Sequence, residues 1–192
     1  MSATESAQKI QAKFGDLVSA PSEFRGEISV RLADAEKIFD VCSFAKTQLG
    51  FDYLVDISSV DQYGEDPRWT VVYHLRGLGH GQELRVSTQV SEEKSELPSV
   101  FAVWRTANWH EREIYDMMGI RFTGHPDLRR ILMWEGYPYF PLRKDFPLAG
   151  KPTDLPGVAF TQPAPLEGGP FVTVAGGKDS IDREPRVRNP ET

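Results

Sequence analysis

The sequence has very little cysteine: Cys42 is the one thiol among 192 residues. A single thiol excludes a disulfide within the chain, and it excludes an iron–sulfur cluster held by this chain alone, because such clusters need several thiolate ligands. We expect Cys42 to be a small, buried apolar side chain on a helix. Long apolar runs are also missing, since no stretch approaches the roughly 20 apolar residues of a membrane span. Any membrane association would therefore have to come through partners.

The chain also lacks an excess of basic residues. Its formal net charge is -6, whereas a nucleic-acid-binding protein needs a basic face for the phosphates, so we expect no nucleic-acid partner. The opening residues, MSATESAQKI, have neither the basic-plus-apolar pattern of a signal peptide nor the arginine-rich character of a transit peptide. We therefore expect the chain to stay in the compartment where it is made.

The first third of the sequence predicts two helices and a strand between them. Ser2 and Glu5 have the spacing of a capping box, and the apolar residues that follow predict a helix over about residues 4–18. Alternating apolar residues predict a strand at 27–32. A second helix is expected to begin after Asp34 and to end at Gly50.

Three strand candidates follow, at 51–60, 68–76 and 82–90. The links between them are short and rich in turn residues, which predicts antiparallel hairpins. A third helix is expected over about 108–118, with Asn108 as its cap, Glu111 at its third position and Gly119 just past its end. Helices, then a run of strands, then a helix is an α+β order.

The composition changes at about residue 150. Residues 150–192 contain half of the 14 prolines and six of the 16 glycines, and they show no helical periodicity. Such a segment is disordered or lies on a partner, although PFVTVAGG could form one short strand. The sequence predicts an α+β domain over 1–148, with N-terminal helices packed on a mainly antiparallel sheet. An extended proline- and glycine-rich tail over 149–192 is expected to lie on partner subunits.

The predicted third helix is crowded with polar side chains. Glu113 and Asp116 share a face with His110 nearby, which is one possible arrangement for acid–base catalysis. Arg112, however, has the i,i+4 spacing of an ion pair with Asp116, and an arginine beside an acid keeps it ionised and lowers its pKa. A network of ion pairs is therefore the favoured interpretation. The remaining helix positions are largely apolar (Trp109, Ile114, Tyr115 and Met118), which is typical of a helix buried between two bodies.

Other candidate sites fail on spacing. The glycines of GLGHG separate two predicted strands, where a hairpin turn explains them, and not a strand and a helix. HEREI lacks the second histidine of a zinc-protease motif, because Ile114 stands at that position, and the other histidines are scattered. We expect no catalytic, cofactor-binding or metal-binding residue in this chain.

The stretch MWEGYPYFPLRKDFPL, residues 133–148, alternates aromatic side chains with prolines. Because proline blocks helix, we expect this segment to run extended and rather rigid. Aromatics with arginine are typical of hot spots in protein–protein interfaces. A pocket for a cationic aromatic ligand is the alternative.

Two blocks of residues carry a family resemblance. The first, EREIYDMMGIRFTGHPDLRRIL, includes Glu111, Arg112, Glu113, Tyr115, Asp116, Gly119, His125, Pro126 and Arg130; the second, PLRKDFPL, includes Pro141, Arg143, Lys144, Asp145, Phe146 and Pro147. Together they resemble the signature of the 30 kDa subunit family of proton-pumping NADH-quinone oxidoreductase, respiratory complex I.

The resemblance implies a subunit of the hydrophilic arm with no redox centre of its own. FMN, iron–sulfur clusters and quinone would lie in partner subunits, the 49 kDa subunit and other hydrophilic-arm subunits would be its partners, and the membrane arm would be contacted only indirectly. It also implies a peripheral position on the cytoplasmic side of the bacterial inner membrane, and a role for the motif residues in assembly at a subunit interface.

Two alternatives remain open at this point. The chain could be the equivalent subunit of a related hydrogenase-type or photosynthetic quinone-reducing complex. It could instead be a stand-alone enzyme that uses Glu113, Asp116 and His110 as acid–base groups.

Overall fold

The computed structural model describes residues 2–147. The predicted tail over 149–192, with its possible PFVTVAGG strand, lies outside the described residues. The helices are α1 (Ala3–Phe14), α2 (Ile38–Leu49) and α3 (Ala107–Met118), with short 3-10 turns η1 (Gly15–Leu17) and η2 (Ala35–Lys37). The strands are β1 (Ser22–Phe24), β2 (Glu27–Leu32), β3 (Tyr53–Asp61), β4 (Trp69–Gly77), β5 (Gln82–Val90), β6 (Glu96–Pro98) and β7 (Arg121–Thr123).

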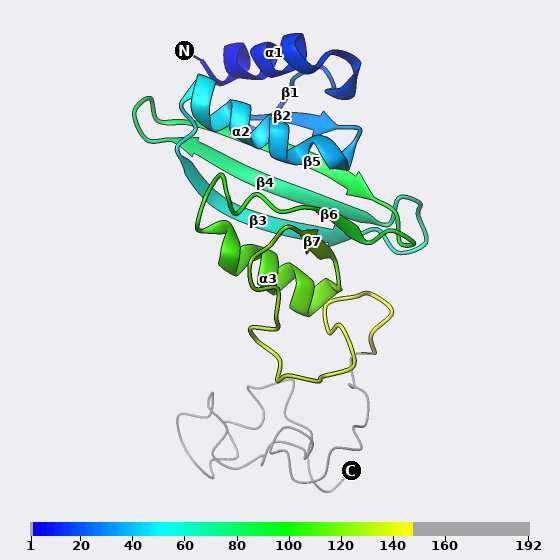
Figure 1. The fold of residues 1–192 in the computed structure, drawn as a ribbon. Helices are drawn as coiled ribbons and strands as arrows, with labels where there is room; N and C mark the ends of the chain where they lie inside the picture. The colour runs from blue at the N-terminus through cyan, green and yellow to red at the C-terminus, as the bar shows by residue number, and fades with distance from the viewer. Residues whose placement is uncertain (1, 148–192) are drawn as a thin grey trace, which may run out of the picture. The chain divides into compact units, whose positions relative to one another are not determined.

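Five strands form one sheet in the order β1-β2-β5-β4-β3. The hairpins β3–β4 and β4–β5 are antiparallel, as predicted, whereas β2 pairs with β5 in parallel, with Val30 opposite Val86. Strands β6 and β7 form a separate parallel pair. In Figure 1, α1 and α2 lie toward the β2–β5 side of the sheet and α3 lies beside β3. The mainly antiparallel α+β architecture is therefore confirmed.

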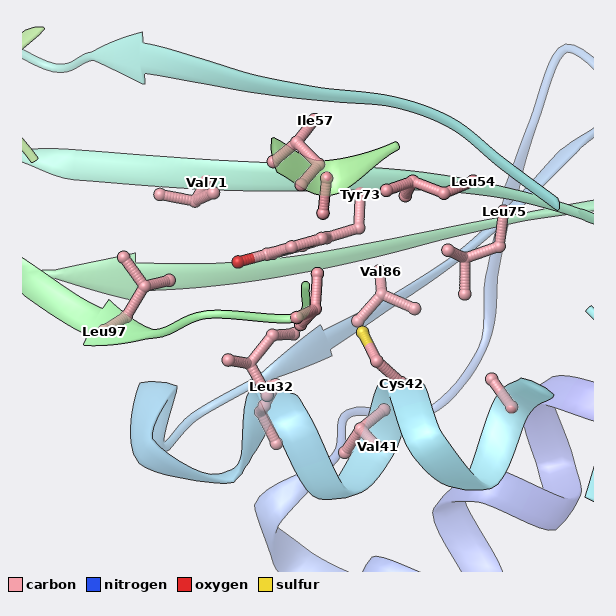
Figure 2. Close-up of a cluster of buried hydrophobic side chains, with 14 of the residues drawn as sticks. Leu32, Val41, Cys42, Leu54, Ile57, Val71, Tyr73, Leu75, Val86 and Leu97 are labelled. Carbon is pink, nitrogen blue, oxygen red and sulfur yellow. The ribbon is translucent and has the colours of Figure 1, made fainter. Parts of the chain in front are cut away.

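The core lies between one face of the sheet and α2. Alternate residues of β4, among them Val71 and Tyr73, turn toward this face and are fully buried, as the two-residue period of a strand requires. Figure 2 shows Tyr73 and Val86 reaching from the sheet toward Cys42 and its helical neighbours on α2. Cys42 is buried and unpaired, as expected. Burial of each large apolar side chain stabilises the fold by about 1.5–3 kcal/mol.

Local signals account for the ends of the first two long helices. The capping box is confirmed, because the Ser2 hydroxyl accepts from the Glu5 amide and the Glu5 carboxylate accepts from the Ser2 amide. Asp34 caps the short η2 turn that leads into α2. Gly50 ends α2 with a left-handed φ of 77°, a conformation that suits a residue without Cβ.

The prediction that Asn108 caps α3 was wrong. The helix begins one residue earlier, and its N-cap position is Thr106, which makes no side-chain capping bond. A turn preceding the helix already pairs its first amides: the Ala107 amide donates to the Trp104 carbonyl and the Asn108 amide to the Arg105 carbonyl. A side-chain cap is therefore not needed there.

Within residues 2–147, none of the helices has both the length and the apolar character needed to cross a bilayer.

Candidate functional site

Helix α3 presents the first motif block, and most of its polar side chains turn inward. Glu111, Arg112 and Asp116 are buried, whereas Glu113 is exposed. Buried polar groups must find partners inside the protein, because an unmatched one costs about 1–3 kcal/mol. The partners of these three residues define the site.

Asp116 holds the main chain that follows β7. One carboxylate oxygen, Oδ2, accepts from the amides of Ile131, Leu132 and Met133 at 3.0, 2.7 and 2.8 Å. The other, Oδ1, accepts from Arg130 Nη1 at 2.5 Å. Four donors on one buried carboxylate leave no lone pair available for a substrate, so Asp116 acts as a structural anchor.

Two arginines complete this arrangement. Arg112 donates to the carbonyls of Arg129 and Arg130 at 3.1 and 2.9 Å, and Arg130 donates to the carbonyls of Asp116, Tyr137 and Tyr139. The predicted ion pair between Arg112 and Asp116 was wrong, because the arginine that pairs with Asp116 comes from outside the helix. We call Arg112, Asp116 and Arg130, with the main chain they hold, the Asp116 clamp.

The clamp keeps Asp116 ionised. Burial alone would raise the pKa of its carboxyl, but hydrogen bonds from the Met133 amide, from Arg130 and from two further amides outweigh burial and hold the pKa below its usual value. The predicted direction is confirmed, although the cation responsible is Arg130.

Glu111 lies in a different environment from Asp116. Its side chain is fully buried and accepts from the Ser99 hydroxyl at 2.6 Å and from the Val100 amide at 2.7 Å. His125 Nε2 lies 3.9 Å from the Glu111 carboxylate. Burial raises the pKa of Glu111 to about 7, because these bonds do not compensate for the lost hydration.

The second motif block packs on the end of α3. Gly119 ends the helix with a φ of 79°, and the Arg143 Nε–H donates to the Met118 carbonyl at 2.6 Å. The guanidinium of Arg143 also stacks on the rings of Phe140 and Trp69, at 4.4 and 5.0 Å from their centroids. Arg143, expected at a subunit interface, thus makes its described contacts within the chain.

We predict that Gly119→Ala destabilises this junction by about 1–3 kcal/mol. A Cβ at this position would lie 2.5 Å from Arg143 Nη2 and 2.7 Å from Phe140 Cζ, and the positive φ adds backbone strain. Urea unfolding of the two proteins should measure the loss. Gly124→Ala is the matched control, since it shares a φ of 79° but its Cβ would meet nothing within 4 Å. Equal losses in both variants would show that packing against Arg143 and Phe140 contributes nothing.

A buried ion pair at the sheet end anchors the rest of the second block. Arg68 donates to both carboxylate oxygens of Asp61 at 2.9 Å, and both side chains are almost fully buried. Asp61 also accepts from the Lys144 amide at 2.8 Å, and Arg68 reaches Asp145 at 3.2 Å. The hydrogen bond from Arg68 is the main reason that the pKa of Asp61 lies below its usual value.

Residues 133–147 follow a series of turns, so the prediction of an extended segment was wrong. The Tyr137 amide donates to the Trp134 carbonyl, and the Arg143 and Phe146 amides donate to carbonyls three residues back. Proline prevented a helix, as expected, but Arg130 binds the carbonyls of Tyr137 and Tyr139 and draws the chain back toward α3.

The remaining predicted residues take minor places. Tyr115, Pro141 and Phe146 are half-buried, and Pro126, Lys144 and Pro147 are exposed. Sequence reasoning missed Asp61, Arg68 and Ser99, which supply partners to the motif. Asp61 and Arg68 flank a predicted hairpin turn, and opposite charges at the two ends of such a turn are the signal that could have pointed to them.

The acid–base alternative finds little support in the geometry. Asp116 is committed to the clamp, Glu113 is exposed, and His110 Nδ1 pairs with Asp56 on β3 at 3.3 Å. The three residues therefore do not converge on one point. Over residues 2–147, no three histidine, cysteine or acidic side chains gather in a way that could hold a metal ion.

Three large apolar side chains remain exposed on α3 and on the main chain tied to it. Trp109, Leu132 and Leu142 are 57, 63 and 57% exposed. Arg112 lies over the Trp109 ring, while the amides of Leu132 and Leu142 donate to Asp116 and to the Met117 carbonyl. We call these three residues the exposed apolar set.

Comparison with known proteins agrees with the motif. The family model described as "Respiratory-chain NADH dehydrogenase, 30 Kd subunit" matches residues 32–152. The second C-type subunit of NADH-quinone oxidoreductase from Rhizobium etli is 46% identical over 160 residues, which is 82% of this chain and 84% of that protein. The C-type subunit of the same enzyme from Geobacter sulfurreducens is 43% identical over 143 residues, which is 74% of this chain and 88% of that protein.

Solved structures agree as well. A trypsin-resistant fragment (1–134) of Nqo5 is 36% identical and superimposes with a TM-score of 0.54, over 63% of this chain and 95% of the fragment. A chain of the membrane-bound sulfane sulfur reductase, an archaeal respiratory membrane complex, is 24% identical with a TM-score of 0.64, over 75% of this chain and 85% of that one, and so supports the fold alone. From the matched residues and the identities, the chain belongs to the family of the 30 kDa subunit of respiratory-chain NADH dehydrogenase.

Proposed function

We propose that this chain is a non-catalytic docking subunit in the peripheral arm of a proton-translocating NADH:quinone oxidoreductase. Electrons would pass from NADH through FMN and iron–sulfur clusters to quinone, all bound by partner subunits. The chain would contact the 49 kDa subunit near the quinone site and would lie on the cytoplasmic side of the membrane. Relatives named as NADH-quinone oxidoreductase subunits, at 43–46% identity, support this over a hydrogenase-type or photosynthetic complex.

One observation carries the docking role. The charged motif residues spend their hydrogen bonds on the chain's own main chain, while the exposed apolar set remains on the surface that they hold. Catalysis needs an available acid, base or nucleophile in contact with substrate, and the Asp116 clamp leaves none on that carboxylate. A rigid support that displays aromatic and aliphatic side chains suits a protein–protein interface.

Trp109 is the side chain that we expect to contribute most to docking. Trp109→Ala should weaken binding to the 49 kDa partner by about 30-fold or more, because a buried interface tryptophan is typically worth about 2 kcal/mol or more. The fold should be unaffected, since more than half of this side chain is exposed. Titration of the full chain against the purified partner measures the effect.

Leu78→Ala is the matched control for this experiment. Leu78 is 65% exposed but lies beyond β4, in the turn to β5, so its loss should leave the affinity unchanged. Unchanged affinity in Trp109→Ala, or an equal loss in both variants, would contradict docking through α3.

A further inference from the structure

The buried carboxyl of Glu111 is a feature that the docking role does not use. It lies where three segments meet: α3 itself, the Ser99–Val100 link that leaves β6, and the turn that leaves β7 with His125. The Ser99 amide also donates to the Thr123 carbonyl, which ties the two strand ends together. Glu111 therefore contacts both segments that approach the first half of α3.

The groups around Glu111 are neutral or acidic. Ser99 and Val100 are its hydrogen-bond donors, and no arginine or lysine of the described residues bonds to it. Cys42 on α2 and Tyr73 on β4 face it from the core, and burial followed by these neighbouring acidic groups raises the pKa of both. The Tyr73 hydroxyl is buried and has no hydrogen-bond partner in this part of the protein. The surroundings thus offer little that stabilises a negative charge.

His125 offers no permanent counter-charge. Burial lowers the pKa of its imidazole, and the nearby Arg112 lowers it further, against the opposing effects of the Asn108 carbonyl and Asp127. Its Nδ1 accepts from the Asp127 amide at 3.0 Å, which leaves Nε2 turned toward Glu111 and toward the Asn108 carbonyl. An acid and a neutral imidazole 3.9 Å apart can share a single proton.

The consequence for stability has a definite sign. A carboxyl whose pKa is higher in the folded state than in the unfolded state keeps its proton longer when folded. The folded chain therefore loses stability as pH rises from about 4.5, the ordinary value of the carboxyl, to about 7. Ionisation favours an opened arrangement in which water reaches the carboxylate.

We propose that Glu111, Ser99 and His125 form a buried proton-binding latch that holds the β6–α3 link closed when protonated and loosens it when deprotonated. Trp109 lies two residues before Glu111 on the same helix, so the latch also controls the position of that side chain. The chain then docks more tightly at mildly acidic than at mildly alkaline pH. This last step rests on the proposed docking function.

The first experiment tests the latch in the full chain alone. Urea unfolding between pH 5 and 8.5 should show that the unfolding equilibrium constant of the natural protein rises roughly 100-fold, about 2.7 kcal/mol at 1.36 kcal/mol per factor of ten. Glu111→Gln should remove most of this dependence. Glu113→Gln, which changes an exposed glutamate on the same helix, should keep it.

The outcomes decide the latch as follows. A natural-protein slope that persists in Glu111→Gln would overturn it. If that variant does not fold, carboxyl-carbon NMR of Glu111 in the natural protein takes its place: titration near pH 7 supports the latch and titration below pH 5 overturns it.

The second experiment separates the latch from the docking function. Affinity for the 49 kDa partner should be at least threefold higher at pH 6 than at pH 8 in the natural protein, and equal at both in Glu111→Gln. Binding that ignores pH would overturn the coupling while docking stands. Absence of binding at both values would overturn the docking function, and the unfolding experiment alone would then decide the latch.

Discussion

Asp116→Ala should lower the free energy of unfolding by about 3–5 kcal/mol, the cost of removing one partner from a buried, hydrogen-bonded charge pair. The substitution leaves the Arg130 guanidinium and the amides of residues 131–133 without their acceptor. Urea unfolding at pH 7 measures the loss. The segment after β7 should also become more accessible, with faster amide exchange at Leu132 and Met133.

Asp127→Ala is the matched control for the Asp116 substitution. Asp127 also pairs with an arginine, Arg129, at 2.9 Å, but both side chains are more than half exposed, so its loss should cost at most about 1 kcal/mol. Because the pKa of Asp116 is lowered in the folded protein, its contribution is present above the ordinary value near 3.8 and disappears as the pH falls below it. A loss below about 1 kcal/mol in Asp116→Ala at pH 7 would show that the clamp does not stabilise the fold.

Asp61→Ala should have a comparable effect, about 3–5 kcal/mol, at the other end of the site. It leaves the buried Arg68 guanidinium without the bidentate acceptor that sustains it, and it removes the acceptor of the Lys144 amide. Thermal or urea unfolding measures the change. Residues 141–147 should also lose protection from proteases, because Lys144 and Asp145 are attached to this pair.

Glu92→Ala controls for the general loss of an acidic partner. Glu92 bonds to the same guanidinium at 2.6 Å, but its side chain is 59% exposed, so water can replace it and the expected cost is at most about 1 kcal/mol. Equal costs for Asp61→Ala and Glu92→Ala would contradict the view that burial makes the first pair important.

Much of the fold could be predicted because its signals are local. Capping and helix termination at Ser2, Gly50 and Gly119 depend on residues within one or two turns, and the hairpins depend on short links. The parallel pairing of β2 with β5 could not be predicted in this way, because it depends on which strand edges remain free once the hairpins have formed. The short strands β1, β6 and β7 are three residues each, too few for a periodic pattern to appear.

The residues of the site could be predicted, but their partners could not. The motif marked Arg112, Asp116 and Arg130, yet helical spacing suggested a pair between the first two. In the folded chain Asp116 bonds to Arg130, 14 residues away in sequence. Similarly, the burial that raises the pKa of Glu111 comes from packing against the distant elements α2 and β4, which helical spacing does not reveal.

The parallel joint between β2 and β5 also affects the order in which the fold can assemble. The Thr88 hydroxyl donates to the Leu32 carbonyl across 56 residues of chain, whereas the strands of each hairpin are joined by a short turn. Closing the longer loop costs more chain entropy and delays the contact. The β3–β5 meander can therefore form early as a nucleus, and the N-terminal helices with β1 and β2 add to it in a later, slower step.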